Sequence, residues 1–298
     1  MPSTFTAVSY GQTLPHDSLA TIRRVLSGAG VDIVRESHRS HPGFESLAFS
    51  LSVTDASDDD AVARVRARLA AEPVPNVDTA VVPDSLRNAE RKFIIMDVDS
   101  TLIQQEVIEL LAAHAGTEAE VAQVTEAAMR GELDFAESLH HRVATLAGLS
   151  ESVLTDVGAA IKLSVGAERL VAEAKAAGHT VAAVSGGFSQ ILAPLAARLG
   201  LDFALANDLE IVDGRLTGKV SGAVVDRASK ATSLLAWSAE VGIAVEATMA
   251  IGDGANDLDM MAAAALGVAF NAKPAVRAVA DAQINLPNLD VALALAGI

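Results

Sequence analysis

Two aspartates follow a short apolar run near the end of the first third of the chain. Asp97 and Asp99 come directly after Phe93–Met96, and Ser100 and Thr101 follow them. Carboxylates and hydroxyls are the ligands that a hard cation such as Mg²⁺ prefers, and that cation often binds phosphate in turn. The pattern indicates metal-assisted chemistry on a phosphate group. The alternative is a buried strand that runs into an ordinary Asp/Ser turn.

Two later strands also end in polar, glycine-rich turns. Ser185-Gly186-Gly187 opens a helix, so its hydroxyl and backbone N–H groups form a natural anion cradle. Gly252–Asp257 adds the carboxylate of Asp253. Lys230, near the start of another helix, supplies a fixed positive charge. In a parallel sheet the three turns lie along one edge, which favours a single shared site.

The segments that must position these residues alternate between strand and helix patterns from residue 86 to residue 298. Such alternation predicts an α/β domain with a doubly wound, Rossmann-like parallel sheet. Its expected strands are 93–96, 180–184, 247–251 and 266–270, with a hairpin at 209–217 that turns at Asp213-Gly214. Between the first two strands, residues 104–161 have only helical spacing. We expect this insertion to be a helical cap that covers the site and selects the substrate.

Residues 1–85 have the pattern of a separate small domain. The predicted order β-α-β-β-α-β is that of an α+β ferredoxin-like fold. This order resembles the ACT domains that sense amino acids, although the loop Gly11–Pro15 lacks their Asp-x-Pro-Gly signature. The segment His38–His41 carries two imidazoles without a nearby acid, and we expect a solvated loop there rather than a metal site.

Composition excludes several classes of function. The chain has 298 residues and a net charge of -16, which argues against nonspecific binding to nucleic acid or to anionic membranes. It has no cysteine, so disulfides and thiolate chemistry are excluded. Hydrophobic residues make up 51% and aromatic ones only 3%, which indicates a core of Ala, Val and Leu. Without a signal peptide or a membrane-spanning apolar stretch, we expect a cytoplasmic protein.

The motifs together resemble those of the haloacid dehalogenase superfamily of phosphohydrolases, and within it the phosphoserine phosphatase family. The resemblance covers about residues 92–285, and all four core motifs are intact. They are Asp97–Thr101, Ser185, Lys230 and Gly252–Asp257. Two features of the lid also match that family. These are Glu106 and the set Phe135, Ser138, Leu139, Arg142 and Val143.

The resemblance implies roles for the acidic residues. Asp97 would be the nucleophile that forms an aspartyl-phosphate. Asp99 would protonate the leaving oxygen and then deprotonate the attacking water. Mg²⁺ would be held by Asp97, by the backbone carbonyl of Asp99 and by Asp253. Asp257 would orient the metal shell or Lys230 rather than bind the metal directly.

The resemblance also implies a substrate, O-phospho-L-serine, and the final step of serine biosynthesis. Glu106 would pair with the substrate ammonium and Arg142 with its carboxylate. The phosphate would be held by Ser185, Gly186, Lys230 and Asn256. One alternative for Glu106 and Arg142 is a charged pair on solvated helices. Alternatives for the whole chain are another small phosphomonoester substrate, an alcohol as phosphate acceptor, or a non-catalytic amino-acid sensor.

The amino-terminal region is expected to make the chain a homodimer, and feedback by serine is the second role considered for it. Deleting residues 1–85 should then change the oligomeric mass or the response to serine. If neither changes, the region is a passive appendage.

Overall fold

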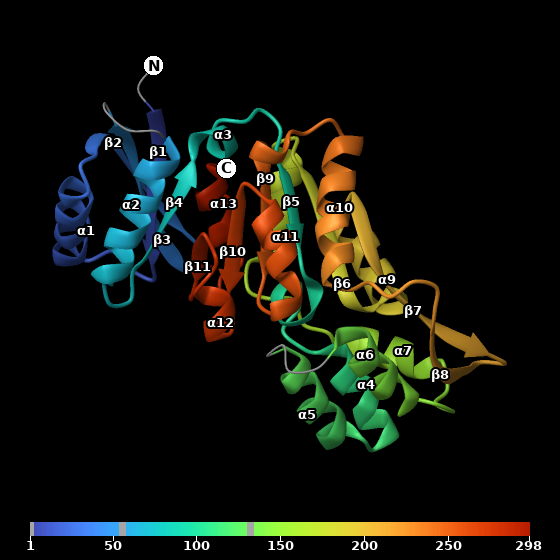
Figure 1. The fold of residues 1–298 in the computed structure, drawn as a ribbon. Coiled ribbons are helices and arrows are strands. Elements are labelled where there is room, and N and C mark those ends of the chain that lie inside the picture. Colours follow the sequence, from blue (N-terminus) through green and yellow to red (C-terminus); the bar gives the residue numbers. More distant parts are fainter. Residues whose placement is uncertain (1–2, 54–57, 130–133) are drawn as a thin grey trace.

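The computed structural model describes residues 3–53, 58–129 and 134–298, which form two sheets (Figure 1). The smaller sheet is antiparallel, with strand order β2-β3-β1-β4. Its strands are β1 (Ser3–Gly11), β2 (Asp32–His41), β3 (Phe44–Val53) and β4 (Asp78–Pro83), and its helices are α1 (His16–Gly28) and α2 (Asp58–Ala71). The helices share a core with one face of this sheet. The predicted ferredoxin-like order is confirmed.

The expectation of a loop at His38–His41 is wrong, because these residues end strand β2. His41 pairs with Phe44 and His38 with Leu47 across a tight turn at Pro42-Gly43. Gly43 has a φ of 89°, which allows the strand to reverse within two residues. The His41 ring stacks on Phe44 with ring centroids 4.4 Å apart. No cluster of potential metal ligands forms around these histidines among the residues that the structure describes.

The larger sheet has the order β11-β10-β9-β5-β6-β7-β8 and is parallel except for the pair β7–β8. The strands are β5 (Phe93–Met96), β6 (Thr180–Phe188), β7 (Phe203–Val212), β8 (Arg215–Ser221), β9 (Thr248–Gly252), β10 (Leu266–Phe270) and β11 (Ala282–Ile284). The connecting helices are α8 (Ala167–Ala176), α9 (Ser189–Leu199), α10 (Arg227–Glu240), α11 (Leu258–Ala263), α12 (Pro274–Arg277) and α13 (Val291–Ala296). The doubly wound sheet is confirmed.

Strand β5 lies at the centre of this sheet, between β6 and β9. All four of its residues are buried. Ile94 belongs to the core on one face of the sheet and Ile95 to the core on the other, as the alternation of side chains along a strand requires. Burial on both faces explains why the strand has no polar alternation. Its carboxyl end, where the chain becomes polar, opens toward the site.

Four of the helices between β5 and β6 form the cap at the lower right of Figure 1. They are α4 (Val107–Ala115), α5 (Glu118–Met129), α6 (Phe135–Ala144) and α7 (Ser152–Ala160). The β7–β8 hairpin reaches this cap. Gly148 N donates to Leu216 O at 2.8 Å, and Leu216 N donates to Leu149 O at 2.9 Å. The sequence predicted the hairpin, with positive φ at Asp213 and Gly214, but not its contact with the cap.

The two sheets share one hydrophobic core. Helix α13, which is buried along its whole length, packs on β1 and β4 of the small sheet and on α8 of the large one. The connector helix α3 (Asp84–Arg87) also contacts it. Across the same boundary the hydroxyl of Tyr10 donates to Gln283 O, and Asn285 Nδ2 donates to Asp78 Oδ1 at 2.9 Å. The β11 strand and helices α11–α13 were not predicted from the sequence. No helix in the described ranges has the length and apolar character needed to cross a membrane.

Candidate active site

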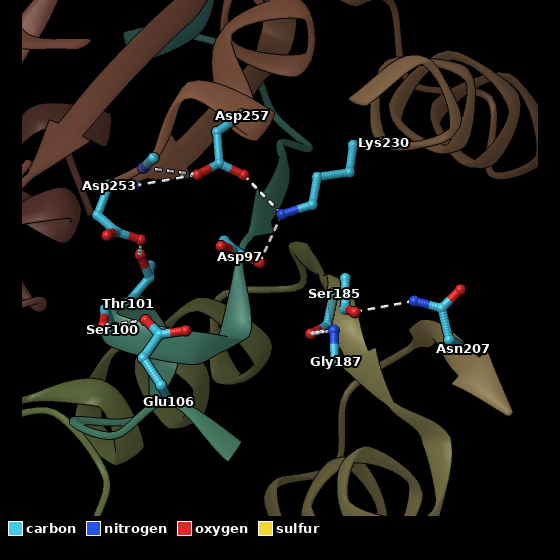
Figure 2. Close-up of polar contacts among 12 residues, drawn as sticks. Asp97, Ser100, Thr101, Glu106, Ser185, Gly187, Asn207, Lys230, Asp253 and Asp257 are labelled. Atoms are coloured by element: carbon cyan, nitrogen blue, oxygen red, sulfur yellow. Dashed lines mark hydrogen bonds and ion pairs between the residues drawn. The ribbon is translucent and has the colours of Figure 1, made fainter. Parts of the chain in front are cut away.

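Asp97 lies at the carboxyl end of the central strand. Its backbone N–H donates to Ile251 O at 2.9 Å, which continues the sheet pairing one residue beyond β5. The side chain is buried, and its Oδ1 lies 2.6 Å from Nζ of Lys230, which comes from α10 (Figure 2). Lys230 is 0% exposed. Burial alone would lower the pKa of Lys230, but the charges of Asp257 and Asp97 outweigh it and raise that pKa. The lysine is therefore a fixed cation.

Asp257 uses both carboxylate oxygens within the protein. Its Oδ1 accepts a 2.7 Å hydrogen bond from Lys230 Nζ, and its Oδ2 accepts from the backbone N–H groups of Asp253 and Gly254, both at 3.1 Å (Figure 2). A Cβ on Gly252 would lie 2.4 Å from Cγ of Asp257, so only glycine fits at that position. Asp257 therefore holds the turn that presents Asp253, and it orients Lys230.

The loop after β5 adds two contacts that the sequence analysis did not assign. Thr101 Oγ1 donates to Asp253 Oδ1 at 3.2 Å, which ties this loop to the turn after β9. Ser100 adopts a left-handed conformation, with a φ of 57°, and its Oγ donates to Glu106 Oε1 at 2.6 Å. Left-handed backbone is uncommon for residues other than glycine and is often found at functional sites. The two hydroxyls thus fix two different acids of the site.

Three buried carboxylates lie close enough to bind one cation. Ligand oxygens of Asp97, Asp253 and Asp257 are within 4.8 Å of one another. Burial, and after it the charge of Asp257, raises the pKa of Asp97 to about 7. Burial and the same neighbouring charge also raise the pKa of Asp253. Lys230 neutralises one of the three charges, so a divalent cation matches what remains. All the donors are oxygens, which fits Mg²⁺.

The gain in melting temperature that MgCl₂ gives is expected to grow as pH rises from about 4 to about 7. The raised pKa of Asp97 means that over this range the folded, metal-free protein keeps a proton that the unfolded chain has already lost. Its free energy of unfolding therefore decreases as pH rises. A bound cation compensates the ionised carboxylates and removes that loss. Thermal melts in EDTA and in MgCl₂ across this range check the prediction, and a constant difference would contradict it.

The sequence analysis expected the strand to end at Val184 and a turn to follow, but β6 continues to Phe188, and the proposed anion cradle Ser185–Gly187 is an irregular turn within its last residues. Ser185 is buried, and its Oγ accepts a 2.8 Å hydrogen bond from Gly187 N (Figure 2). A Cβ on Gly187 would lie 3.0 Å from that Oγ and 3.1 Å from Oδ2 of Asp99, so glycine lets the turn approach the acid. Helix α9 begins two residues later, at Ser189.

One cavity joins the cradle to the cap. Its walls include Asp97, Asp99, Glu106, Arg142, Ser185, Gly186 and Asn256. Burial, followed by the charges of Glu106 and Asp97, raises the pKa of Asp99. Two buried oxygens in this wall, Oδ1 of Asp99 and Oδ1 of Asn256, have no hydrogen-bond partner within the described part of the chain. Buried polar atoms are rarely left unpaired in this way, so a ligand in the cavity would satisfy them.

The cap contributes one acid and one guanidinium to the same cavity. Arg142 is buried and held by its Nη1, which donates to Thr125 Oγ1 at 3.0 Å, and by its Nε, which donates to Ser138 O at 3.2 Å. Burial lowers the pKa of Arg142 and raises that of Glu106. The alternative of a charged pair on solvated helices does not fit these positions. The side chain of Phe135 lies outside the described residues.

The structure thus brings together every residue that the sequence analysis proposed for the site. It adds Thr125 and Asn207, and it gives Thr101 of the first motif a partner; each of the three holds one of those residues or its loop through a hydrogen bond. A lone Thr or Asn in a helix or strand carries no sequence signal for such a role, because its partner is distant in the chain. Only the packing of the cap and the sheet identifies it.

Comparison with known proteins gives a consistent picture. Residues 94–262 match the family model described as haloacid dehalogenase-like hydrolase. A phosphoserine phosphatase of Streptomyces coelicolor is 50% identical over 289 residues, which cover 97% of this chain and 69% of that protein.

Solved structures agree. A phospho-aspartyl intermediate analogue of phosphoserine phosphatase, 40% identical, matches 69% of this chain and 99% of its own with a TM-score of 0.67. A probable phosphoserine phosphatase of Vibrio cholerae, 35% identical, matches 98% of this chain and 87% of its own with a TM-score of 0.76.

Proposed function

Because the chain belongs to the haloacid dehalogenase-like hydrolases, and within them to the phosphoserine phosphatase family, we propose that it hydrolyses O-phospho-L-serine to L-serine and phosphate. One observation carries the choice of substrate. A single cavity has an anion cradle on one wall and a cap that supplies both an acid and a guanidinium on the other. A small zwitterion with a phosphate group complements all three.

The proposed first step is attack by a carboxylate oxygen of Asp97 on phosphorus. The new O–P bond forms as the bond from phosphorus to the seryl oxygen breaks, and Asp99 gives its proton to that oxygen. The raised pKa of Asp99 favours the protonated form that this step needs. Lys230 holds Oδ1 of Asp97 and so orients the carboxylate.

The second step returns the enzyme to its starting state. Asp99, now ionised, takes a proton from the water that attacks phosphorus, and the bond to Asp97 breaks as phosphate forms. Ser185, the N–H of Gly186, Lys230 and Asn256 would hold the phosphate oxygens through both steps. Because these donors are fixed before the reaction, little reorganisation accompanies the shift of charge.

Mg²⁺ is the proposed cofactor. Asp97, Asp253 and the backbone carbonyl of Asp99 would hold it, and Asp257 would act through its hydrogen bonds to Lys230 and to the turn. When bound, the ion neutralises phosphate charge that would otherwise repel the carboxylate of Asp97. The buried excess of negative charge in this cluster supports the proposal.

Phosphate release from phosphoserine and from simple sugar phosphates, with MgCl₂ present, tests the proposed substrate. We expect phosphoserine to have the higher kcat/KM, and Arg142→Ala to lower it by about 10²-fold, mainly through KM, because the two-pronged contact with the carboxylate is lost. The same variant should cleave para-nitrophenyl phosphate, which has no such carboxylate, at close to the wild-type rate. Equal use of sugar phosphates by the wild-type enzyme would point to another phosphomonoester.

We further propose that residues 1–85 form an ACT-like regulatory or dimerisation domain and residues 86–298 the phosphatase domain, with its cap at 104–161. The β-α-β-β-α-β order supports the first assignment. A cytoplasmic homodimer assembled through the small domain remains part of this proposal. The outer edge of that sheet, β2, has no strand partner on one side in the described chain.

A further inference from the structure

Asn207 is a buried amide that joins two parts of the site. It lies in β7 and is 1% exposed. Its Nδ2 donates to Gly186 O at 2.8 Å, and its Oδ1 accepts from Val225 N at 2.7 Å. Figure 2 shows the side chain pointing toward the Ser185 turn. One side chain therefore contacts both the anion cradle and the segment just before α10.

The strand pairing explains why a side chain is needed here. Strands β6 and β7 pair in regular register up to Val184 and Leu205, and the next pair is Phe188 with Asn207. The turn Ser185–Gly187 lies inside this irregularity. A carbonyl that loses water without gaining a partner is costly, and Asn207 supplies a donor to Gly186 O in this partly buried position. Asn suits the position because it donates and accepts at once, which neither Asp nor Leu of similar size can do.

This contact determines how the hydroxyl of Ser185 is directed. The peptide unit between Gly186 and Gly187 has its C=O fixed by Asn207 and its N–H fixed on Ser185 Oγ, at 2.8 Å. Because Ser185 Oγ accepts that hydrogen bond, its own proton is free to be donated into the cavity. If the peptide unit rotates, both the acceptor contact and the direction of the hydroxyl are lost.

The other end of Asn207 reaches the element that carries the catalytic lysine. Val225 precedes α10, and Lys230 lies in the first turn of that helix, with Nζ on Asp97 and Asp257. The amide thus links the position of the Ser185 hydroxyl to that of the Lys230 ammonium. Both groups face the place where the phosphoryl group would sit.

We propose that Asn207 is a positioning residue for phosphate binding and transfer, which aligns Ser185 through the Gly186–Gly187 peptide and keeps it in register with Lys230. The proposal rests on the proposed function for the identity of the group in the cradle. It assigns no contact between Asn207 and the substrate.

Asn207→Asp tests the contact with the cradle. In the variant, one carboxylate oxygen still accepts the hydrogen bond from Val225 N. The other oxygen replaces the amide nitrogen, so Gly186 O loses its hydrogen-bond donor and faces an oxygen instead. When an enzyme loses one aligned hydrogen-bond donor to the charge that develops in the transition state, kcat falls by about 10²-fold. We expect a fall of that size with phosphoserine, because the Ser185 hydroxyl would no longer be aligned. The dissociation constant of inorganic phosphate, measured by calorimetry with MgCl₂, should rise about tenfold or more. Inhibition by L-serine, which contacts the cap, should stay within about twofold.

Asn288→Ala serves as the matched control, since Asn288 is also a buried amide, 6% exposed, whose Nδ2 contacts Pro42 O rather than the site. It should lower the melting temperature without changing kcat or phosphate affinity.

If Asn207→Asp binds phosphate and turns over phosphoserine as the wild type does, the inference is wrong and the proposed function stands. If phosphate binding weakens but the wild type leaves phosphoserine intact, the inference stands and the proposed substrate is wrong. Equal weakening of phosphate and L-serine binding would also overturn the inference, since it indicates general loosening.

Discussion

Asp97→Asn is expected to lower kcat for phosphoserine by at least about 10⁴-fold, as the loss of a nucleophile does in other covalent mechanisms. The amide has nearly the same shape as the carboxylate, but it is a poor nucleophile and a neutral metal ligand. Both proposed functions of the side chain are removed together. KM should change much less, because the residues proposed to bind the substrate remain in place, namely Ser185, Lys230, Glu106 and Arg142.

The same substitution is expected not to destabilise the metal-free protein. Asp97 lies buried beside Asp253 and Asp257, and burial together with the charge of Asp257 raises its pKa to about 7. Removing this carboxylate relieves repulsion among the three acids, although it also removes one ion pair from Lys230. Asp257 still pairs with that lysine, at 2.7 Å. The melting temperature in EDTA should therefore equal or exceed that of the wild type at neutral pH.

Phosphate release in a stopped assay and thermal melts in EDTA measure the two effects. Asp259→Asn is a suitable control, because Asp259 is a partly exposed aspartate that pairs with Arg227 at 2.5 Å and does not line the cavity. It should leave kcat within about twofold, as most surface substitutions do. Residual turnover above about one per cent of wild type by Asp97→Asn, in freshly prepared protein, would rule out Asp97 as the nucleophile.

The sequence could bring Asp97 and Asp253 to one site because each of them follows a buried strand. Buried strands such as β5 and β9 are short apolar runs, and the polar turn after each is visible as an abrupt change of composition. The parallel arrangement then puts Asp97 and Asp253 at one edge of the sheet without knowledge of any distance. Local pattern and fold class were sufficient for these two acids, whereas Glu106 and Arg142, which belong to the cap, were assigned only from the resemblance to a known family.

The sequence could not predict the contacts that hold these residues in place. Asn207 and Gly186 are 21 residues apart, and Thr101 and Asp253 are 152 apart. Each pair meets only because the strands lie in one particular order. The contact of the β7–β8 hairpin with the cap was also unpredictable. A hairpin pattern in the sequence indicates which two strands pair, but not which other element the hairpin contacts. The error at His38–His41 arose because the pairing of β2 with β3 overrides the local polarity of the segment.

Removal of residues 1–83 is expected to prevent the rest of the chain from folding to a stable, soluble protein. The sequence alone favoured a separate domain over residues 1–85, whose deletion would change the oligomeric mass or the response to serine, or neither if the region is a passive appendage. In the structure, however, α13 is buried along its whole length, and its six residues are Val-Ala-Leu-Ala-Leu-Ala. It packs on β1 and β4, so the deletion would expose to water the side of this entirely apolar helix that the two strands cover.

A catalytic part of this kind can exist alone, because a solved relative matches 69% of this chain and 99% of its own length. A catalytic domain that lacks the small sheet needs polar side chains where α13 lies in this chain, because water contacts that surface. Here α13 has no polar side chain. The small sheet therefore acts as part of the core of the phosphatase, whatever its further role in assembly or regulation.

Tyr10 provides a graded test of this shared core within the full chain. Its ring is 1% exposed in the same cluster as α13, and its hydroxyl donates to Gln283 O across the boundary. Tyr10→Ala should lower the free energy of unfolding by about 3–5 kcal/mol, and Tyr10→Phe by about 1 kcal/mol. Urea unfolding followed by Trp237, the single tryptophan, reports on the phosphatase part, because that ring stacks on Phe203 of β7. If Trp237 unfolds at the same urea concentration in Tyr10→Ala as in the wild type, the two sheets are independent. A shift of the whole transition, with kcat of the folded protein unchanged, is the result that a shared core requires.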